Sequence, residues 1–223
     1  LPVWCTSFPA SSVSSTGALS FTSAASQNGT ATITLKLTDS GGLANGGVDE
    51  SATQDFTITI NSVNDAPGFT KGADQTVDED AGAQTVTPWA TAISPGPADE
   101  SGQSVSFTVT NDNPSLFSVA PAVASDGTLS YTPAPNANGE ATITLKAVDD
   151  GAPPAESAEQ TFKITVTPVN DAPGFALPAS PDQSVAQDSG PQTVAGFATN
   201  ISKGPADESG QTLTFDVSND NAA

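Results

Sequence analysis

The sequence contains no histidine, no arginine and no methionine, and Cys5 is the single cysteine among its 223 residues. Without histidine, a serine or cysteine nucleophile has no imidazole beside it to act as a base. Without arginine, the chain lacks the bidentate guanidinium groups that grip phosphate and guanine. A lone cysteine cannot form an intramolecular disulfide. These absences argue against an enzyme and against nucleic acid as a partner.

Positive charge is also scarce, because five lysines face 25 acidic residues and the formal net charge is −20. A chain this acidic repels nucleic acid and anionic membrane surfaces, whereas divalent cations are attracted to it. No apolar run approaches the roughly 20 residues that span a bilayer, so we expect no membrane insertion. The first ten residues lack the basic start and long apolar centre of a signal peptide. We therefore expect any secretion signal to lie outside this sequence or to have been removed.

A seven-residue stretch, Val63-Asn64-Asp65-Ala66-Pro67-Gly68-Phe69, recurs unchanged from Val169 to Phe175, 106 residues further on. An identity of this length at a domain-sized interval marks a joint between copies of one module. Alanine before proline is biased to an extended backbone, and proline fixes the next φ angle. The stretch therefore predicts a stiff linker between modules.

The repeats divide the chain into three parts. Residues 19–22 match residues 129–132 at an offset of 110, and residues 96–103 recur as an identical string at 204–211. We predict that residues 1–63 are the second half of a module and that residues 64–169 are one complete module. Residues 170–223 would then be the first half of a third module.

Apolar side chains alternate with polar ones in several short segments, for example at Val105, Phe107 and Val109 and again at Ile143, Leu145 and Ala147. This period of two is typical of half-buried strands, and no segment shows a sustained helical period. About seven such strands in roughly 100 residues is typical of a sandwich. The predicted fold is all-β, with tandem Greek-key β-sandwich modules of about seven strands. Trp89, whose place Phe197 takes in the third module, is the expected core aromatic.

Each predicted half-module would expose apolar faces and unpaired strand edges. Two interpretations follow. The chain is a window from a longer tandem array, or the C-terminal half-module of one chain completes the N-terminal half-module of the next. The second arrangement does not close on itself and would build a filament.

Four motifs together resemble a known family: Asn64-Asp65-Ala66-Pro67, Val77-Asp78-Glu79-Asp80, Tyr131-Thr132-Pro133 and Val148-Asp149-Asp150-Gly151. The chain looks like the cadherin-like, immunoglobulin-fold tandem repeats of large bacterial surface proteins and adhesins. The resemblance covers essentially the whole sequence. It implies a structural or adhesive role, with no catalysis, in a secreted or cell-surface bacterial protein.

The resemblance also implies calcium at the joints, because acidic residues of neighbouring cadherin domains hold calcium beside the linker. Calcium prefers six to eight oxygen ligands from carboxylates, amides and carbonyls. Carried over by position, the ligands are Asn64, Asp65, Asp99, Glu100 and Asp149 at the first joint, and Glu79, Asn170, Asp171, Asp207 and Glu208 at the second. Ser62 and Pro168 replace the first aspartate of the family's linker, and Gln187 replaces Glu79 in the third module. One or two weakly bound ions per joint therefore fit better than a three-ion cluster.

Simpler interpretations stay open for the same residues. In these interpretations, the linker aspartates would cap local turns. Asp149-Asp150-Gly151 would be a turn, and Asp78-Glu79-Asp80 would be a solvated acidic loop. The predicted function is an extracellular repeat array that spaces and stiffens a surface fibre with calcium at its joints. Its expected partners are neighbouring modules, another copy of the chain head to tail, and a cell-surface or glycan target. The alternatives are a filament-forming subunit and a carbohydrate-binding accessory module.

Overall fold

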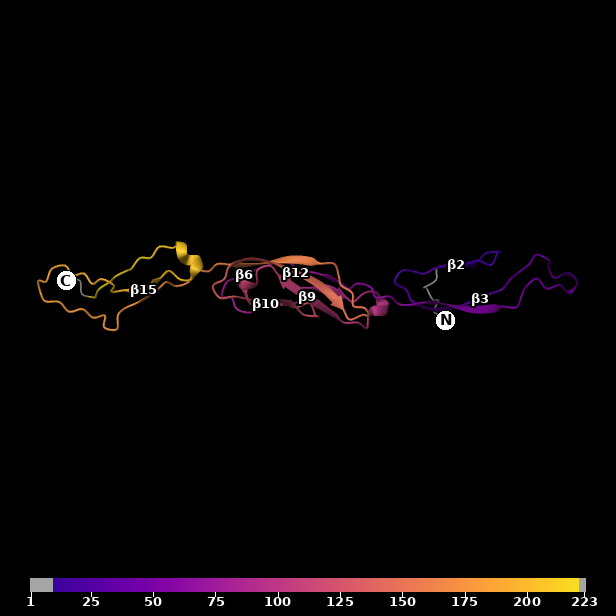
Figure 1. Ribbon diagram of the computed structural model, residues 1–223, viewed down its shortest axis with the longest axis horizontal. Coiled ribbons are helices and arrows are strands. Elements are labelled where there is room, and N and C mark those ends of the chain that lie inside the picture. The colour runs from indigo at the N-terminus through magenta and orange to yellow at the C-terminus, as the bar shows by residue number, and fades with distance from the viewer. Residues whose placement is uncertain (1–9, 221–223) are drawn as a thin grey trace.

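The computed structural model describes residues 10–220. Cys5 lies outside the described residues. The chain forms an elongated row of three parts, with the middle module (residues 64–169) between an N-terminal segment (residues 10–63) and a C-terminal segment (residues 170–220), as Figure 1 shows. The boundaries of these parts follow the sequence repeat and stay a prediction.

The middle module contains two main sheets. One has the strand order β6 (Gln75–Asp78), β13 (Gln160–Thr167), β12 (Gly139–Asp149) and β9 (Val105–Asn111). The other has the order β10 (Phe117–Val123), β11 (Leu129–Pro133) and β7 (Gln84–Val86). All neighbours are antiparallel except β13 and β6, which run parallel. The chain crosses between the two sheets after β6, β7, β9 and β11, as in a Greek key, whereas β10–β11 and β12–β13 are hairpins within one sheet.

The seven strands of these two sheets confirm the predicted all-β sandwich. A further antiparallel pair, β5 (Gly68–Thr70) with β8 (Thr91–Ser94), lies outside the two main sheets. Helical structure in the described residues is limited to short 3₁₀ turns: η1 (Ala44–Gly46), η2 (Ala98–Glu100), η3 (Pro114–Leu116) and η4 (Ala206–Gly210). No helix in residues 10–220 has the length and apolarity that crossing a membrane requires.

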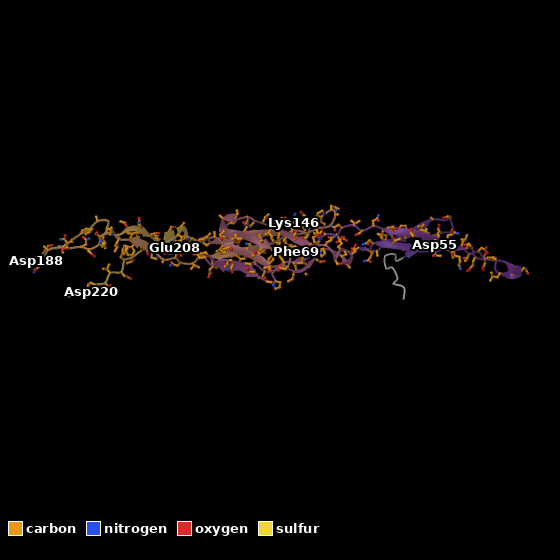
Figure 2. All side chains as sticks on the ribbon, turned by 90° about the horizontal axis from the view of Figure 1, so that it is seen from below. Asp55, Phe69, Lys146, Asp188, Glu208 and Asp220 are labelled. Atoms are coloured by element: carbon orange, nitrogen blue, oxygen red, sulfur yellow. The ribbon has the colours of Figure 1, made fainter. Side chains whose placement is uncertain are left out.

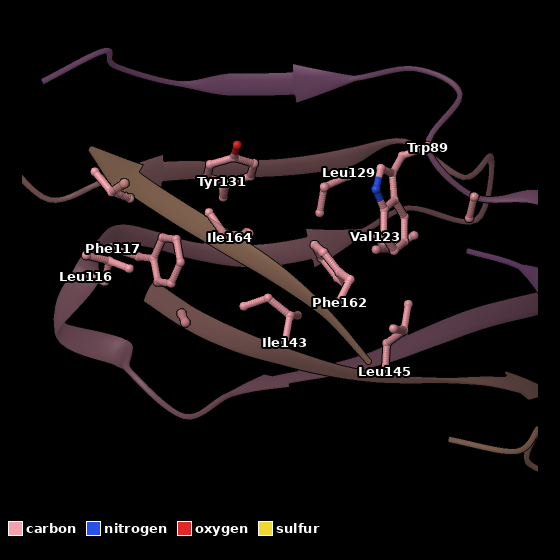
Figure 3. Packing of buried hydrophobic residues seen from close by; sticks show 13 residues of the cluster. Trp89, Leu116, Phe117, Val123, Leu129, Tyr131, Ile143, Leu145, Phe162 and Ile164 are labelled. Carbon is pink, nitrogen blue, oxygen red and sulfur yellow. The ribbon is translucent and has the colours of Figure 1, made fainter. Parts of the chain in front are cut away.

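The core of the middle module lies between its two sheets (Figure 3). The alternating positions of β12 and β13 are buried, as the period of two predicts: Ala141, Ile143, Leu145, Ala147, Phe162, Ile164 and Val166. Trp89 is buried as well, with its ring centroid 4.3 Å from that of Phe162. Its indole Nε1 donates a hydrogen bond to the carbonyl of Ala73 at 2.9 Å. Trp89 is thus a core residue, which removes it as an exposed platform for a sugar.

The two flanking segments form hairpins without a comparable core. In the N-terminal segment β1 (Ala10–Val13) pairs with β2 (Leu19–Thr22), and β3 (Gly29–Leu35) pairs with β4 (Gln54–Ile60). In the C-terminal segment β14 (Gly174–Ala176) pairs with β15 (Thr199–Ser202). Isolated two-stranded ribbons have no second layer on which to bury an apolar face. Large apolar side chains are accordingly exposed here: Leu19, Leu37, Val185, Val194, Leu213, Phe215 and Val217.

Candidate metal centres at the two joints

The two copies of the repeated linker connect the parts of the chain. Joint 1 (residues 61–67) connects β4 to β5, and joint 2 (residues 168–173) connects β13 to β14. Both Asn-Asp pairs lie beside a short 3₁₀ turn, η2 at joint 1 and η4 at joint 2, which belongs to the identical string at residues 96–103 and 204–211. At each joint, one copy of the repeated linker therefore lies beside one copy of the repeated eight-residue string.

At joint 1, two side chains from the η2 region hold the linker. The backbone N–H of Asp65 donates to Glu100 Oε1 at 2.7 Å, and Gln103 Nε2 donates to Asn64 Oδ1 at 2.7 Å. We call this arrangement the linker clasp. It uses both the backbone and the side chain of the linker, so the orientation of the Asn-Asp pair is fixed by the module that follows it.

Asp149, at the end of β12, contacts the same linker. Its Oδ1 accepts hydrogen bonds from Asn64 Nδ2 and from the backbone N–H groups of Gly151 and Ala155, each at 3.0 Å. These bonds hold the pKa of the Asp149 carboxyl below its usual value, and the bond from the backbone N–H of Ala155 contributes most. The turn that the sequence predicts at residues 149–151 therefore exists, and its carboxylate is ionised and directed at the joint.

Asp99 connects joint 1 to the preceding segment. Its Oδ2 accepts hydrogen bonds from Asn28 Nδ2 and, at 3.4 Å, from Ser62 Oγ. Asn28 lies directly before β3, so this contact crosses from the N-terminal segment to the middle module. The structure thus brings all five residues predicted for the first joint to the linker: Asn64, Asp65, Asp99, Glu100 and Asp149.

Joint 2 repeats the clasp with the corresponding residues of the C-terminal segment. The backbone N–H of Asp171 donates to Glu208 Oε1, and Gln211 Nε2 donates to Asn170 Oδ1 at 2.8 Å. Figure 2 shows Glu208 close to where the C-terminal segment meets the middle module. The same two contacts at both joints indicate that the clasp belongs to the repeat unit.

The middle module adds Glu79 to joint 2. Glu79 Oε1 accepts from the backbone N–H of Val169 at 2.7 Å, and its Oε2 accepts from Asn138 Nδ2 at 3.2 Å. Glu79 is buried with 2 % of its surface exposed, so it is a packed part of the joint and its position differs from the solvated loop considered above. Asp207 lies near enough to Asp171 to affect it electrostatically, which completes the predicted second set.

One glycine in each clasp makes room for the glutamate. A Cβ added to Gly96 would fall on Glu100 Oε2, and a Cβ added to Gly204 would fall on Glu208 Oε2. Both glycines have a positive φ angle, +159° and +130°. Glycine is therefore required at these positions for the carboxylate to fold back over the backbone.

The clasp glutamates keep one oxygen without a protein partner. Glu100 Oε2, Asp149 Oδ2 and Glu208 Oε2 are buried and accept no hydrogen bond, while their residues are only 3 %, 4 % and 4 % exposed. A buried carboxylate oxygen without a partner is costly, because it has lost its hydration and gained nothing in exchange. Oxygens in this state are suited to a hard cation.

The charges at joint 2 repel one another. Burial raises the pKa of the Asp171 carboxyl, and the negative charges of Asp80, Glu208, Glu79 and Asp207 raise it further. No three Asp, Glu, His or Cys side chains within residues 10–220 lie close enough together to hold an ion by themselves. The donors at the joints would therefore need completion by amide and backbone carbonyl oxygens, which calcium accepts readily.

The orphaned oxygens of Glu100 and Asp149 at joint 1 are of the type that calcium takes, and Asp99 and Asn64 are the further candidate holders beside them. At joint 2 the candidates are Glu79, Asp171, Asp207 and Glu208. Sequence reasoning missed the contacts of Gln103, Gln211, Asn28 and Asn138 with these residues. The identity of residues 96–103 with 204–211 was the signal that could have identified the two glutamines.

No known family model matches the sequence, and no curated protein matches it. Among solved structures, the chain is similar to extracellular cadherin domains 3–6 of protocadherin gamma B2, at 21% sequence identity and a TM-score of 0.37. The match covers 59% of this chain and 34% of that structure. The fold class accordingly rests on the sheets of the chain itself.

Proposed function

We propose that this chain is part of an extracellular structural and adhesive repeat array whose joints bind calcium. The observation that carries the proposal is the pair of clasped linkers, each with a buried glutamate oxygen that has no protein partner. A site of this kind is unfavourable without a cation and favourable with one, so calcium would act as a switch of joint stiffness.

Three features support a mechanical role. The chain is elongated, its parts follow one another in a row, and the linkers are short (Figure 1). The clasp ties each linker to the module that follows. From the preceding side, Asn28 bonds to Asp99 at joint 1, and Glu79 of the middle module holds the backbone of Val169 at joint 2. Calcium would supply the positive charge that neutralises these carboxylates, and the chain's own residues would hold the two sides of each joint in one orientation.

A structural role without catalysis also agrees with where the carboxylates lie. They belong to repeated joints, and the sequence has no histidine to serve as a base. We place the array outside the cell, in a bacterial secreted or surface protein, because weak calcium sites are occupied only where calcium is abundant. Extracellular modules bind it with dissociation constants of roughly 10⁻⁴–10⁻³ M.

Thermal unfolding with calcium and with a chelator tests the proposal. At about 10 mM calcium, one such site would add about 1.4–2.7 kcal/mol to the free energy of unfolding, because the ion binds only the native state. Magnesium at the same concentration is the control for ionic strength. An unchanged melting temperature in calcium would contradict the proposal.

Two substitutions localise the effect. Glu100→Gln and Glu208→Gln each keep the size of the side chain and an acceptor oxygen for the clasp, but they remove the charge that calcium needs. Each variant should lose part of the calcium-dependent stabilisation, and the double variant should lose most of it. Glu159→Gln, directly before β13 and on no described hydrogen bond, is the matched control. Equal calcium responses in all four proteins would place the ion elsewhere.

A further inference from the structure

Three stretches of the C-terminal segment repeat strands of the middle module in sequence but are not strands themselves. Residues 183–186, 192–194 and 213–219 correspond to β6, β7 and β9 at an offset of 108. They keep the apolar alternation, as in Leu213, Phe215 and Val217, yet none of them pairs with another strand. Sequence alone therefore does not decide whether these stretches become strands.

Within residues 170–220 these stretches have no pairing partner, which explains the difference. In the middle module β6 pairs with β13, β7 with β11 and β9 with β12. In the N-terminal segment, β4, β2 and β3 are the sequence equivalents of β13, β11 and β12, in that order. The C-terminal segment contains no equivalent of these three strands among its described residues. By contrast, β14 and β15 pair with each other, as β5 and β8 do, and both are formed. A strand without a partner leaves its backbone groups unpaired, so it does not form.

The N-terminal segment shows the complementary deficit. Its hairpin β3–β4 has the same register as β12–β13, with Gly29 opposite Ile60 where the middle module has Gly139 opposite Val166. Positions that are buried in the middle module are open here. Leu37 is 77% exposed and Leu19 is 41% exposed, whereas their equivalents Ala147 and Leu129 are fully buried. In the C-terminal segment Val217 is 90% exposed, whereas its equivalent Val109 is partly buried. The two segments therefore expose the two halves of one core.

We propose that the C-terminal segment of one chain adds its three unformed strands to the N-terminal segment of a second copy and so completes a sandwich. The middle module supplies the register. In the middle module, Leu145 lies opposite Val109 and Ala147 lies opposite Phe107. Between two chains, the equivalent pairs would be Leu35 opposite Val217 and Leu37 opposite Phe215. Val166 beside Val77, in the parallel pair, becomes Ile60 beside Val185.

A hollow at joint 1 marks where the second copy enters. Its volume is about 270 Å³, and Asn28, Val63, Asp65 and Asp99 are among the residues that line it. At joint 2 the equivalents of Asn28 and Val63 are Asn138 and Val169, which both donate hydrogen bonds to Glu79. The residue that occupies the position of Glu79 in the C-terminal segment is Gln187. Gln187 of the second copy would thus fill the hollow, and as a neutral side chain it adds no charge beside Asp65 and Asp99.

The two segments lie on opposite sides of the middle module, so one chain in this form cannot complete itself (Figure 1). A head-to-tail contact between different surfaces propagates and gives an open filament. This assembly does not require calcium, so it stands or falls separately from the calcium proposal.

Cross-linking of the full chain tests the register. In a Cys5→Ser background, Thr34→Cys and Ser218→Cys variants are mixed under mild oxidation. These positions correspond to Thr144 and Thr110, which lie opposite each other in the middle module. We expect a disulfide-linked heterodimer from this mixture. Thr34→Cys mixed with Thr212→Cys is the control and should give no comparable product, because residue 212 lies six residues, or roughly 20 Å, from residue 218 along the strand.

Sedimentation velocity of the purified chain gives the second readout. The unaltered chain should form concentration-dependent oligomers, and Val217→Lys should shift it to monomers without changing the melting temperature of the middle module. Ser218→Lys, on the outward face of the same stretch, should still assemble. Monomers that bind an apolar dye and never cross-link would mean that the exposed faces await another occupant, and would overturn the proposal.

Discussion

The clearest test of the packing compares one leucine that occurs in both copies of a strand. Leu129 in β11 is 0% exposed, whereas its counterpart Leu19 in β2 is 41% exposed. The local sequences are nearly the same, since Leu129-Ser130-Tyr131-Thr132 corresponds to Leu19-Ser20-Phe21-Thr22. Any difference between the two substitutions therefore reports burial and not local sequence.

Leu129→Ala removes side-chain volume from a closed core and leaves a cavity among Trp89, Phe162 and their neighbours. Substitutions of this kind cost about 2–5 kcal/mol of unfolding free energy. For a module of this size, such a loss lowers the melting temperature by about 10 °C or more. Leu19→Ala removes a side chain that is already half in water, so we expect a loss below about 1 kcal/mol in the monomer.

Urea unfolding, followed by the near-ultraviolet circular dichroism to which buried Trp89 contributes, measures both losses. The measurement uses the Val217→Lys background, which the assembly proposal expects to be monomeric. Equal losses for the two variants, or a loss below about 1 kcal/mol for Leu129→Ala, would refute the assignment of the core, because a filled and fully buried site does not tolerate that deletion.

The remaining predictions concern the joints. Gly96→Ala should displace the Glu100 carboxylate and weaken calcium binding at joint 1 by about 10–100-fold, as loss of a supporting contact does in metal sites. Gly102→Ala meets no atom within 4 Å and should leave the affinity unchanged in calorimetric titration. Because the pKa of Asp171 is raised, calcium-free stability at joint 2 should fall as the pH rises from the ordinary Asp pKa of 3.8 through the raised value. Because the pKa of Asp149 is lowered, its contribution should be present above 3.8 and lost as the pH falls through the lowered value. Melting curves in chelator across this range, with Asp171→Asn and Asp149→Asn as controls, should show the two opposite slopes, and slopes that survive these substitutions would contradict the assignment.

Much of the middle module could be predicted from the sequence, because its strands are half-buried and their apolar period is visible. The alternation at Ile143, Leu145 and Ala147 identified the inward face of β12, and all three are buried. The exchange of Trp89 for Phe197 identified a core aromatic. The pair β5–β8 was not predicted, because its segments are too short to show a period.

The contacts at the joints could be predicted only in part. The repeated Asn-Asp stretch indicated where the joints lie, but periodicity gives no information about which side chain reaches a linker through space. The bond from Gln103 to Asn64 joins residues that are 39 positions apart, and Gly96 matters only because Glu100 folds back over it. The alternation at residues 213–219 showed only that they can form a strand, because a period of two says nothing about whether a partner strand is present.

The central claim, that calcium stiffens the joints, is tested most directly by the distance distribution across joint 1. Thr57 in β4 and Thr108 in β9 are exposed and lie on strands on either side of the linker. Spin labels at these positions, in a Cys5→Ser, Val217→Lys background, report the distance by pulsed electron spin resonance. We predict a broad distribution in chelator that narrows to a single peak with calcium, and no narrowing when Glu100→Gln is added. Equally broad distributions with calcium and with chelator would contradict the claim.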